Sequence, residues 1–491
     1  MGARFTLILV VVMAAGLSGC FESQRDETFE DTVVLDDVDV RVLNAMSDAP
    51  ELTLDVDDKA RLEALAYGEA GEFSLPANQY RFRVRGDTGK AELATLLDGA
   101  QDNLEEEQRY DLVLAGLLGD DSGQVVLFGE DDERFDGETQ EERDEENEDL
   151  SESEKKTGPL EQVRVRAAHV TAGAGPVDVY LDDGPGQSIG GDREPDTTLA
   201  FGERSAPLLV EEDVYRLRLT EAGNAGNVVY DSGARLDFEF EDDLLLAAVP
   251  NTGIDNASYP VSLAVVDGTD ATVFRDNDQQ GGLQFVHAAG GEASVDVAVN
   301  GTATWSSVPF AGVEPGSGPS GYSLESAADY DITVDDSGDS LIVDENLRLD
   351  RGRGTSALLV ENTYTETNRD LLVLNNDDRS VMTNARVRVA HAANATPQKV
   401  DIYRVETGAS LSSEGTVQDP LVEGLGYLHA SGYLAVPEST DHELVVTPAG
   451  TPGTELLRAS ITLEKGGNYR LVVAGDGNTD DVQLIRLGGV R

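Results

Sequence analysis

The phrase Arg164-Val-Arg-Ala-Ala-His169 is followed, after a short loop, by Val177-Asp-Val-Tyr180. This pair of phrases decides the fold of the chain because it recurs. Its copies are Leu283-Gln-Phe-Val-His287 with Val295-Asp-Val297, Arg386-Val-Arg-Val-Ala-His391 with Val400-Asp-Ile-Tyr403 and, more faintly, Val40-Arg-Val-Leu-Asn44 with Leu52-Thr-Leu-Asp-Val56. The copies lie roughly a hundred residues apart, which is too long for a solenoid repeat and suits a string of whole small domains. We therefore interpret the 491 residues as four copies of one module.

Apolar and polar residues alternate at a spacing of two inside each module. Val163 and Val165, for example, alternate with Arg164 and Arg166. This spacing is typical of strands with one buried face and one face in water. Each module also ends in a nearly continuous apolar strand, such as the one at 244–249. Roughly seven short strands per module predict an all-β fold, with four tandem antiparallel β-sandwiches of the immunoglobulin-like type.

Changes in composition place the boundaries of the modules. We expect β-sandwich modules 1 to 4 at 38–128, 161–275, 281–380 and 383–491, after a signal peptide at 1–19 and a lipidated tether at 20–37. The segment 129–160 is dominated by acidic residues and has almost no apolar content. It cannot bury a core, so we expect a disordered linker whose charges repel one another.

The N-terminus has the layout of a signal peptide. Arg4 precedes an apolar run that is too short to span a membrane, and small residues follow it. The run ends in Leu17-Ser-Gly-Cys20, which resembles the bacterial lipobox, and Cys20 is the only cysteine in the chain. These residues predict lipid attachment at Cys20 and a membrane partner through that anchor. Phe21 stands where an aspartate would favour inner-membrane retention, so we expect an outer-membrane location in the cell envelope, on either face.

The chain is strongly acidic, with 94 acidic residues, 36 basic residues and a formal net charge of −58. Such a surface repels nucleic acid and anionic headgroups, so neither is an expected partner. Two explanations remain open: adaptation to high salt, where screening shortens the repulsion, or binding of cations or a basic partner. The acidity is spread through all four modules, which favours the first explanation.

The repeated phrases resemble the family known as domain of unknown function 4397. Its members open with a strand ending in Val-x-x-x-His-Ala, then a Ser-Pro-Asp-Ala-Pro-like loop and a Val-Asp-Val-Tyr strand. Asn44-Ala-Met-Ser-Asp-Ala-Pro50 keeps the loop without the histidine, whereas the other modules keep the histidine but not the loop. A later family tyrosine matches Tyr80, Tyr215 and Tyr330, with His442 in module 4. The resemblance implies secreted or surface-attached β modules in tandem, and it brings no activity.

One strand position carries a polar residue in every module: Asn44, His169, His287 and His391. A metal site or a general base could be built with the aspartates of the second phrase, Asp178, Asp296 and Asp401. Strand parity places the histidines on the inward face and these aspartates on the outward face. We therefore predict a structural role, in which the side chain bonds to the backbone of the following loop, as Asn44 could also do.

Acidic loops suggest calcium as a possible ligand, with Asp276, Asp278, Asp476 and Asp480 as weak candidates. No loop offers a complete coordinating set, so we expect no cofactor. The chain has no nucleophile elbow and no phosphate-binding glycine loop, so we assign no catalytic residue and expect no enzyme. The predicted function is a salt-adapted, lipid-anchored envelope protein with a structural, adhesive or binding role toward a protein or polysaccharide at the cell surface. A cation-binding surface array is the alternative, and an envelope hydrolase the weaker one.

Overall fold

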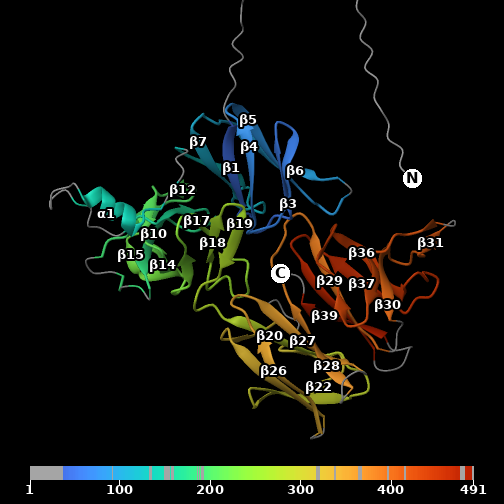
Figure 1. Ribbon diagram of the computed structural model, residues 1–491. Helices are drawn as coiled ribbons and strands as arrows, with labels where there is room; N and C mark the ends of the chain where they lie inside the picture. The colour runs from blue at the N-terminus through green and yellow to red at the C-terminus, as the bar shows by residue number, and fades with distance from the viewer. Residues whose placement is uncertain are drawn as a thin grey trace, which may run out of the picture. The chain divides into compact units, whose positions relative to one another are not determined.

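The computed structural model confirms the predicted all-β sandwich fold (Figure 1). It describes residues 37–90, 92–131, 135, 137–148, 155, 160–184, 186, 188–189, 193–316, 321–336, 339–362, 368–394, 398–413, 416–475 and 482–488. Within these ranges the strands form four pairs of facing sheets, together with one small two-stranded sheet.

Module 1 is the simplest pair of sheets, with strand orders β4-β1-β7-β8 and β3-β2-β5-β6. Its strands are β1 (Asp37–Asn44), β2 (Leu52–Val56), β3 (Lys59–Leu65), β4 (Ala70–Pro76), β5 (Gln79–Gly86), β6 (Ala94–Asn103), β7 (Gln108–Ala115) and β8 (Gln124–Asp131).

Module 2 repeats this plan with the orders β12-β9-β17-β18-β19 and β11-β10-β14-β15, while β13 pairs with β9 and β16 with β14. Its strands are β9 (Val163–His169), β10 (Val177–Asp183), β11 (Thr197–Leu199), β12 (Glu203–Arg204), β13 (Leu208–Val210), β14 (Asp213–Glu221), β15 (Asn224–Asp231), β16 (Leu236–Phe238), β17 (Asp243–Pro250), β18 (Val261–Asp267) and β19 (Asp270–Phe274).

Module 3 has the orders β23-β20-β27-β28 and β22-β21-β25-β26, with β24 paired to β20. Its strands are β20 (Gly281–His287), β21 (Ser294–Val299), β22 (Thr302–Pro309), β23 (Val313–Glu314), β24 (Ser323–Glu325), β25 (Asp329–Asp336), β26 (Asp339–Arg348), β27 (Gly354–Glu361) and β28 (Arg369–Asn375).

Module 4 has the orders β34-β29-β38-β39 and β33-β30-β36-β37, with β35 paired to β29 and β31 to β32. Its strands are β29 (Ala385–Ala392), β30 (Lys399–Glu406), β31 (Ser412–Ser413), β32 (Thr416–Val417), β33 (Val422–Gly426), β34 (His429–Ala430), β35 (Leu434–Val436), β36 (Ser439–Pro448), β37 (Leu457–Leu463), β38 (Asn468–Gly475) and β39 (Val482–Gly488).

The first sheet of each module is mixed rather than purely antiparallel. The opening strand runs parallel to the later apolar strand in the pairs β1·β7, β9·β17, β20·β27 and β29·β38. Parallel neighbours require a crossover connection, and here the chain makes it through the second sheet of the same module. The two repeated phrases of the sequence are therefore the opening strands of the two facing sheets.

Each module has its own core between its two sheets. In module 2 the inward residues Val163, Val165, Leu217, Leu244 and Leu246 are all buried in one cluster. Equivalent clusters lie inside the other three modules. The alternation of the sequence therefore gave the inward face of these strands correctly.

The opposite face of the first sheets was predicted to be wet, and this prediction is wrong. A second set of apolar clusters lies outside the four sandwich cores. One joins Leu43 and Val113 of module 1 to Ala168 and Leu245 of module 2. The other joins modules 3 and 4 through residues that include Val286, Leu358, Ala390 and Val472. Burial on both faces explains why β17, β27 and β38 are almost continuously apolar.

The acidic segment expected to be a disordered linker also contains regular structure. β8 runs on to Asp131, and helix α1 spans Gln140–Glu148. Thr139 and Glu142 form a capping box at the start of this helix, because each side chain bonds to the other's backbone N–H at 2.8 to 3.3 Å. Acidic side chains near the N-terminus of a helix also interact favourably with its dipole. The prediction of disorder is therefore wrong for the end of β8 and for α1, because the low apolar content was considered without this local capping signal.

Candidate functional site

The polar position at the end of each opening strand is completely buried. His169 Nε2 lies 3.0 Å from the carbonyl oxygen of Gly175, and its Nδ1 accepts a 3.4 Å bond from Thr171 N. Asn44 makes the same two kinds of contact in module 1. Its Nδ2 donates to Leu65 O at 2.9 Å, and its Oδ1 accepts from Met46 N at 3.0 Å. These two side chains thus bond the backbone two residues ahead and a more distant backbone carbonyl. Neither ring nitrogen of His287 has a hydrogen-bond partner among the described residues, so the predicted role is not confirmed in module 3.

Aromatic residues accompany the histidines, and the sequence analysis missed them. The rings of Phe201, Phe310 and Tyr427 stand edge-on to His169, His287 and His391, with centroids 6.3, 6.0 and 5.5 Å apart. Tyr67 occupies the equivalent place in module 1, because Gly68 N bonds to Asn44 O as Gly202 N bonds to His169 O. The signal was available in the repeated Ala-Tyr-Gly-Glu and Ala-Phe-Gly-Glu at 66–69 and 200–203.

Burial makes these histidines poor acid–base groups. It lowers the pKa of His169 and takes that of His287 to about 4, since the charged imidazolium is disfavoured away from water. Burial therefore favours the neutral form of both rings. A neutral, enclosed ring suits a structural position better than proton transfer.

The aspartates of the second phrase do not join the histidines. Asp178 accepts bonds from Gly223 N at 2.8 Å and from the Thr198 hydroxyl at 2.6 Å. Asp401 accepts from Gly424 N and Gly450 N, each at 2.7 Å. These two carboxylates were expected to point outward into water, but residues of neighbouring strands and turns cover them and leave them 5% and 4% exposed. Asp296 remains exposed and accepts a bond from Ser307 N at 2.7 Å.

The proposed calcium ligands are only partly within the described residues. Asp276 is buried, and its two oxygens accept 2.8 Å bonds from Asp231 N and Asp278 N. Within the described ranges no group of three or more His, Cys, Asp or Glu side chains could hold a metal ion. Asp476, Asp480 and Cys20 lie outside the described residues.

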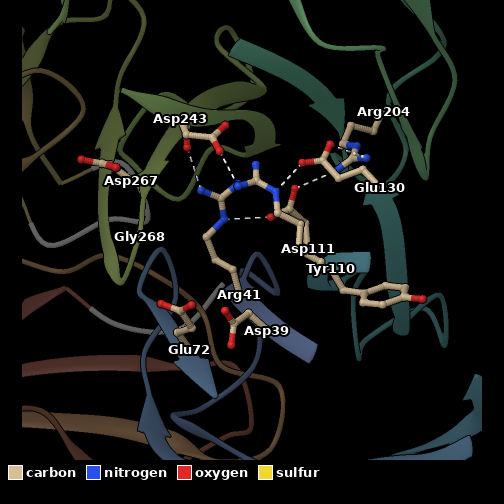
Figure 2. Close-up of a pocket in the computed structure, with 11 residues that line it drawn as sticks. Asp39, Arg41, Glu72, Tyr110, Asp111, Glu130, Arg204, Asp243, Asp267 and Gly268 are labelled. Carbon is tan, nitrogen blue, oxygen red and sulfur yellow. Dashed lines mark hydrogen bonds and ion pairs between the residues drawn. The ribbon is translucent and has the colours of Figure 1, made fainter. Parts of the chain in front are cut away.

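A network of charged side chains joins the first sheets of modules 1 and 2 (Figure 2). Arg166 on β9 has no exposed side-chain surface and lies between two carboxylates, Glu130 of β8 and Asp243 of β17. Its Nε donates to Glu130 at 2.5 Å. Arg109 contacts the same two carboxylates, so the network crosses the boundary between the modules in both directions.

A third carboxylate extends this network along the boundary. Asp111 on β7 accepts 2.8 Å bonds from Arg41 of module 1 and from Arg204 of module 2. Figure 2 shows Arg41 reaching both Asp111 and Asp243, where it donates to the backbone oxygen at 3.0 Å. The residues enclose a cavity of about 250 Å³. Arg166 was predicted to face water, but the partner module covers it.

The charges of this network stabilise one another despite their burial. Burial alone would raise the pKa of Asp243, but hydrogen bonds from Arg164, Arg109 and Arg166 outweigh it and hold that pKa well below its usual range. Arg41 and Arg204 lower the pKa of Asp111 in the same way. The lowered pKa values make Asp243 and Asp111 weak proton acceptors, and we interpret the network as an electrostatic connection between the modules.

The same strand position is polar but uncharged in module 3. Gln284, three residues before its histidine as Arg166 is before His169, is also fully buried. Its amide donates 2.8 Å bonds to Gly321 O and to Leu487 O of module 4, and it accepts from the Ser356 hydroxyl at 3.0 Å. The two module pairs therefore satisfy the same buried position with different chemistry.

Replacing Arg166 by methionine should destabilise the boundary between modules 1 and 2. We expect Arg166→Met to lower the free energy of unfolding by about 3 kcal/mol, because two partly buried carboxylates lose a partner that is itself fully buried. Arg348→Met is the matched control, since its pair with Asp329 at 3.5 Å is more than half exposed; it should cost less than about 1 kcal/mol. Equal effects of the two variants in denaturant titrations would contradict a stabilising role of Arg166 at this boundary.

The same variant should change how stability depends on pH. A carboxylate whose pKa is depressed by folding contributes stability above its unfolded pKa of about 4, and that contribution is lost as the pH falls. Arg166→Met removes one of the hydrogen bonds that lower the pKa of Asp243, so the difference between its folded and unfolded pKa becomes smaller. Its melting temperature should therefore fall less than that of the unchanged protein when the pH is lowered toward about 3.

Two substitutions at His169 test the hydrogen-bonding role. His169→Asn should be mild, because Asn44 makes the equivalent pair of bonds in module 1. His169→Leu should cost about 1–3 kcal/mol, because Thr171 N and Gly175 O lose their partner in a buried site. Thermal unfolding of both variants measures the difference, and equal destabilisation would refute the role.

Residues 38–140 and 281–403 match the family model described as Domain of unknown function (DUF4397). They cover module 1, module 3, and β29 with the first part of β30 in module 4. No curated protein matches the sequence. One similar solved structure is a product complex of SpuA, a multi-modular glycogen-degrading pneumococcal virulence factor, at 11% identity and a TM-score of 0.14. The match covers 62% of this chain and only 37% of that one, and so low a TM-score supports no argument. The resemblance found in the sequence is thus confirmed over these two stretches, which is consistent with tandem DUF4397 modules.

Proposed function

We propose that this β-rich modular protein is a lipid-anchored component of the cell envelope with a structural, adhesive or binding role. The proposal rests on the hydrogen bonds that the repeated polar residues make. His169, Asn44, Asp178 and Asp401 all bond to the backbone of their own module. In these modules the repeated polar positions therefore serve fold-stabilising contacts rather than a repeated catalytic set, which supports a scaffold or binding array.

The location rests on the N-terminal sequence. Leu17-Ser-Gly-Cys20 supports lipid attachment at Cys20, and Phe21 favours the outer membrane over the inner one. In the described part of the chain, no helix has the length and apolar character needed to cross a bilayer. We propose that a protein or polysaccharide at the cell surface is the partner, and that nucleic acid is not, because the charge of −58 repels it.

The same charge supports adaptation to high salt. At molar salt the Debye length is about 3 Å, so carboxylates on the surface hardly repel one another. The basic residues of the network between modules 1 and 2 are arginines, whose guanidinium groups suit buried ion pairs and are less affected by screening than exposed pairs are.

Removing the thiol tests the anchor. Cys20→Ala should move the protein from the membrane fraction to the soluble fraction, because no acyl chain can be attached. Ser23→Ala is the control, since it leaves the thiol in place and should leave the protein in the membrane fraction. Persistent membrane association of Cys20→Ala after cell fractionation would contradict the anchor.

Dilution tests the adaptation to salt. The melting temperature should fall by several degrees when the protein is moved from molar salt to about 0.1 M, where the Debye length rises to about 10 Å and carboxylates repel over longer distances. An unchanged melting temperature would rule out the proposal on salt and leave the anchor untouched.

A further inference from the structure

One strand position donates a hydrogen bond across a module boundary in all four modules. It lies three residues before the buried polar residue near the end of each opening strand, and its occupants are Arg41, Arg166, Gln284 and Arg388. Each module therefore gives such a bond to its partner and also receives one. The acceptors are, in the same order, Asp243 O, a carboxylate oxygen of Glu130, Leu487 O and Asn375 O, at 3.0, 2.5, 2.8 and 2.7 Å.

The apolar contacts across the two boundaries also come from matching positions. In every module the residue just before the buried polar one lies in an inter-module cluster, and so does the residue opposite it on the parallel strand. These pairs are Leu43 with Val113, Ala168 with Ala247, Val286 with Leu358 and Ala390 with Val472. The same patch of each module thus meets its own counterpart. Such an interface is isologous, the kind that two identical subunits form about a twofold axis.

Two tyrosines show that the order of the modules along the chain does not decide how they pair. The hydroxyl of Tyr67 in module 1 donates to Pro250 O at the end of β17 in module 2. The hydroxyl of Tyr427 in module 4 donates to Glu361 O at the end of β27 in module 3. These two acceptors are equivalent, because each lies two residues after the one paired with the histidine of its module. The module that carries the tyrosine comes first in one pair and second in the other.

The connections inside the two pairs differ as well. Residues 132–162 lie between β8 and β9, whereas only residues 376–384 lie between β28 and β29. Neither the chain order nor the length of the connection is shared, yet matching positions make matching contacts. The information for pairing therefore lies in the surface of the sheet. Burial of apolar area favours the contact, and the cross-boundary bonds fix its register.

We propose that the outer face of the first sheet is a recognition surface for another module of the same kind, supplied by the same chain or by a second copy of it. Within one chain, modules 1 and 2 occupy each other's surfaces, and so do modules 3 and 4. When a pair opens, the matching surface of a second chain fits equally well, and such an exchange joins two molecules at low cost. This surface goes beyond the envelope role and does not depend on the lipid anchor.

Cutting the connection tests whether the surface holds a pair together. A recognition sequence for a site-specific protease is inserted after residue 150 of the full-length chain, and light scattering at molar salt measures the mass of the cleaved protein. We expect the two fragments to stay together. Module 1 also contacts the connection between modules 3 and 4, where Arg379 Nη1 donates to Ala49 O at 2.9 Å, so the cleaved Arg379→Ala chain should stay together too. Separation of the fragments in either protein would overturn the proposal.

Substitutions then test which surface holds the fragments. Leu245→Asp places a charge in the apolar cluster between modules 1 and 2, so the cleaved variant should separate into its two fragments. Val228→Asp is the matched control in the same module, because Val228 is 44% exposed, and its fragments should stay together. A cleaved Leu245→Asp chain that remains intact in mass refutes the surface. If that variant does not fold, the mixing experiment decides.

Mixing two cleaved chains tests whether a second copy can supply the partner. One copy carries a C-terminal affinity tag, and the other is labelled with heavy nitrogen. The mixture is held at about 0.1 M salt, where repulsion between acidic modules favours opening, and is then returned to molar salt. Capture by the tag should bring down heavy and light N-terminal fragments in about equal amounts, without the heavy C-terminal fragment. Capture of light N-terminal fragment alone shows that a second copy does not supply the partner, and the proposal is then wrong.

Discussion

The outer faces of the first sheets in modules 1 and 2 are apolar, so each face must be buried against the other. The charged network at this boundary depends on that constraint. Leu43 and Val113 meet Leu245 and Ala168 across this boundary. Burial of that apolar surface also buries Arg166, which lies on the same face. Arg166 can stay charged there only because Glu130 and Asp243 are brought to it.

Modules 3 and 4 also bury the outer faces of their first sheets against each other, and burying Gln284 there carries a smaller desolvation penalty than burying Arg166. Gln284 replaces the arginine and bonds to backbone carbonyls and to Ser356. A neutral amide carries a smaller desolvation penalty than an ion, so fewer partners are needed. The same position thus lies at a boundary in each pair, but its chemistry varies: Gln284 of module 3 is neutral, whereas Arg388 of module 4 is charged and donates to Asn375 O of module 3 at 2.7 Å.

Most of the fold of each module could be predicted from the sequence, because inward and outward residues alternate and the spacing of Val163 and Val165 reports the buried face directly. The parity of His169 placed it inward for the same reason, and Asn44 was expected to make equivalent bonds. The parallel pairing of β9 with β17 was not foreseen, since alternation says nothing about strand direction. The capping box at Thr139 and Glu142 is recognisable in the sequence, but the acidic composition around it led to a prediction of disorder instead.

The sequence by itself determined the repeated modules, their two opening strands and the residues that fill each sandwich core. It did so because these depend on local periodicity and on composition within one module. Only the tertiary structure decided that the second face of each first sheet is buried, and that Arg166 and Gln284 are interior residues. It also decided that Tyr67 and Tyr427 bond to equivalent strand ends in their partner modules. Those outcomes depend on which module covers which, and an alternating pattern is the same whether its polar face meets water or another protein surface.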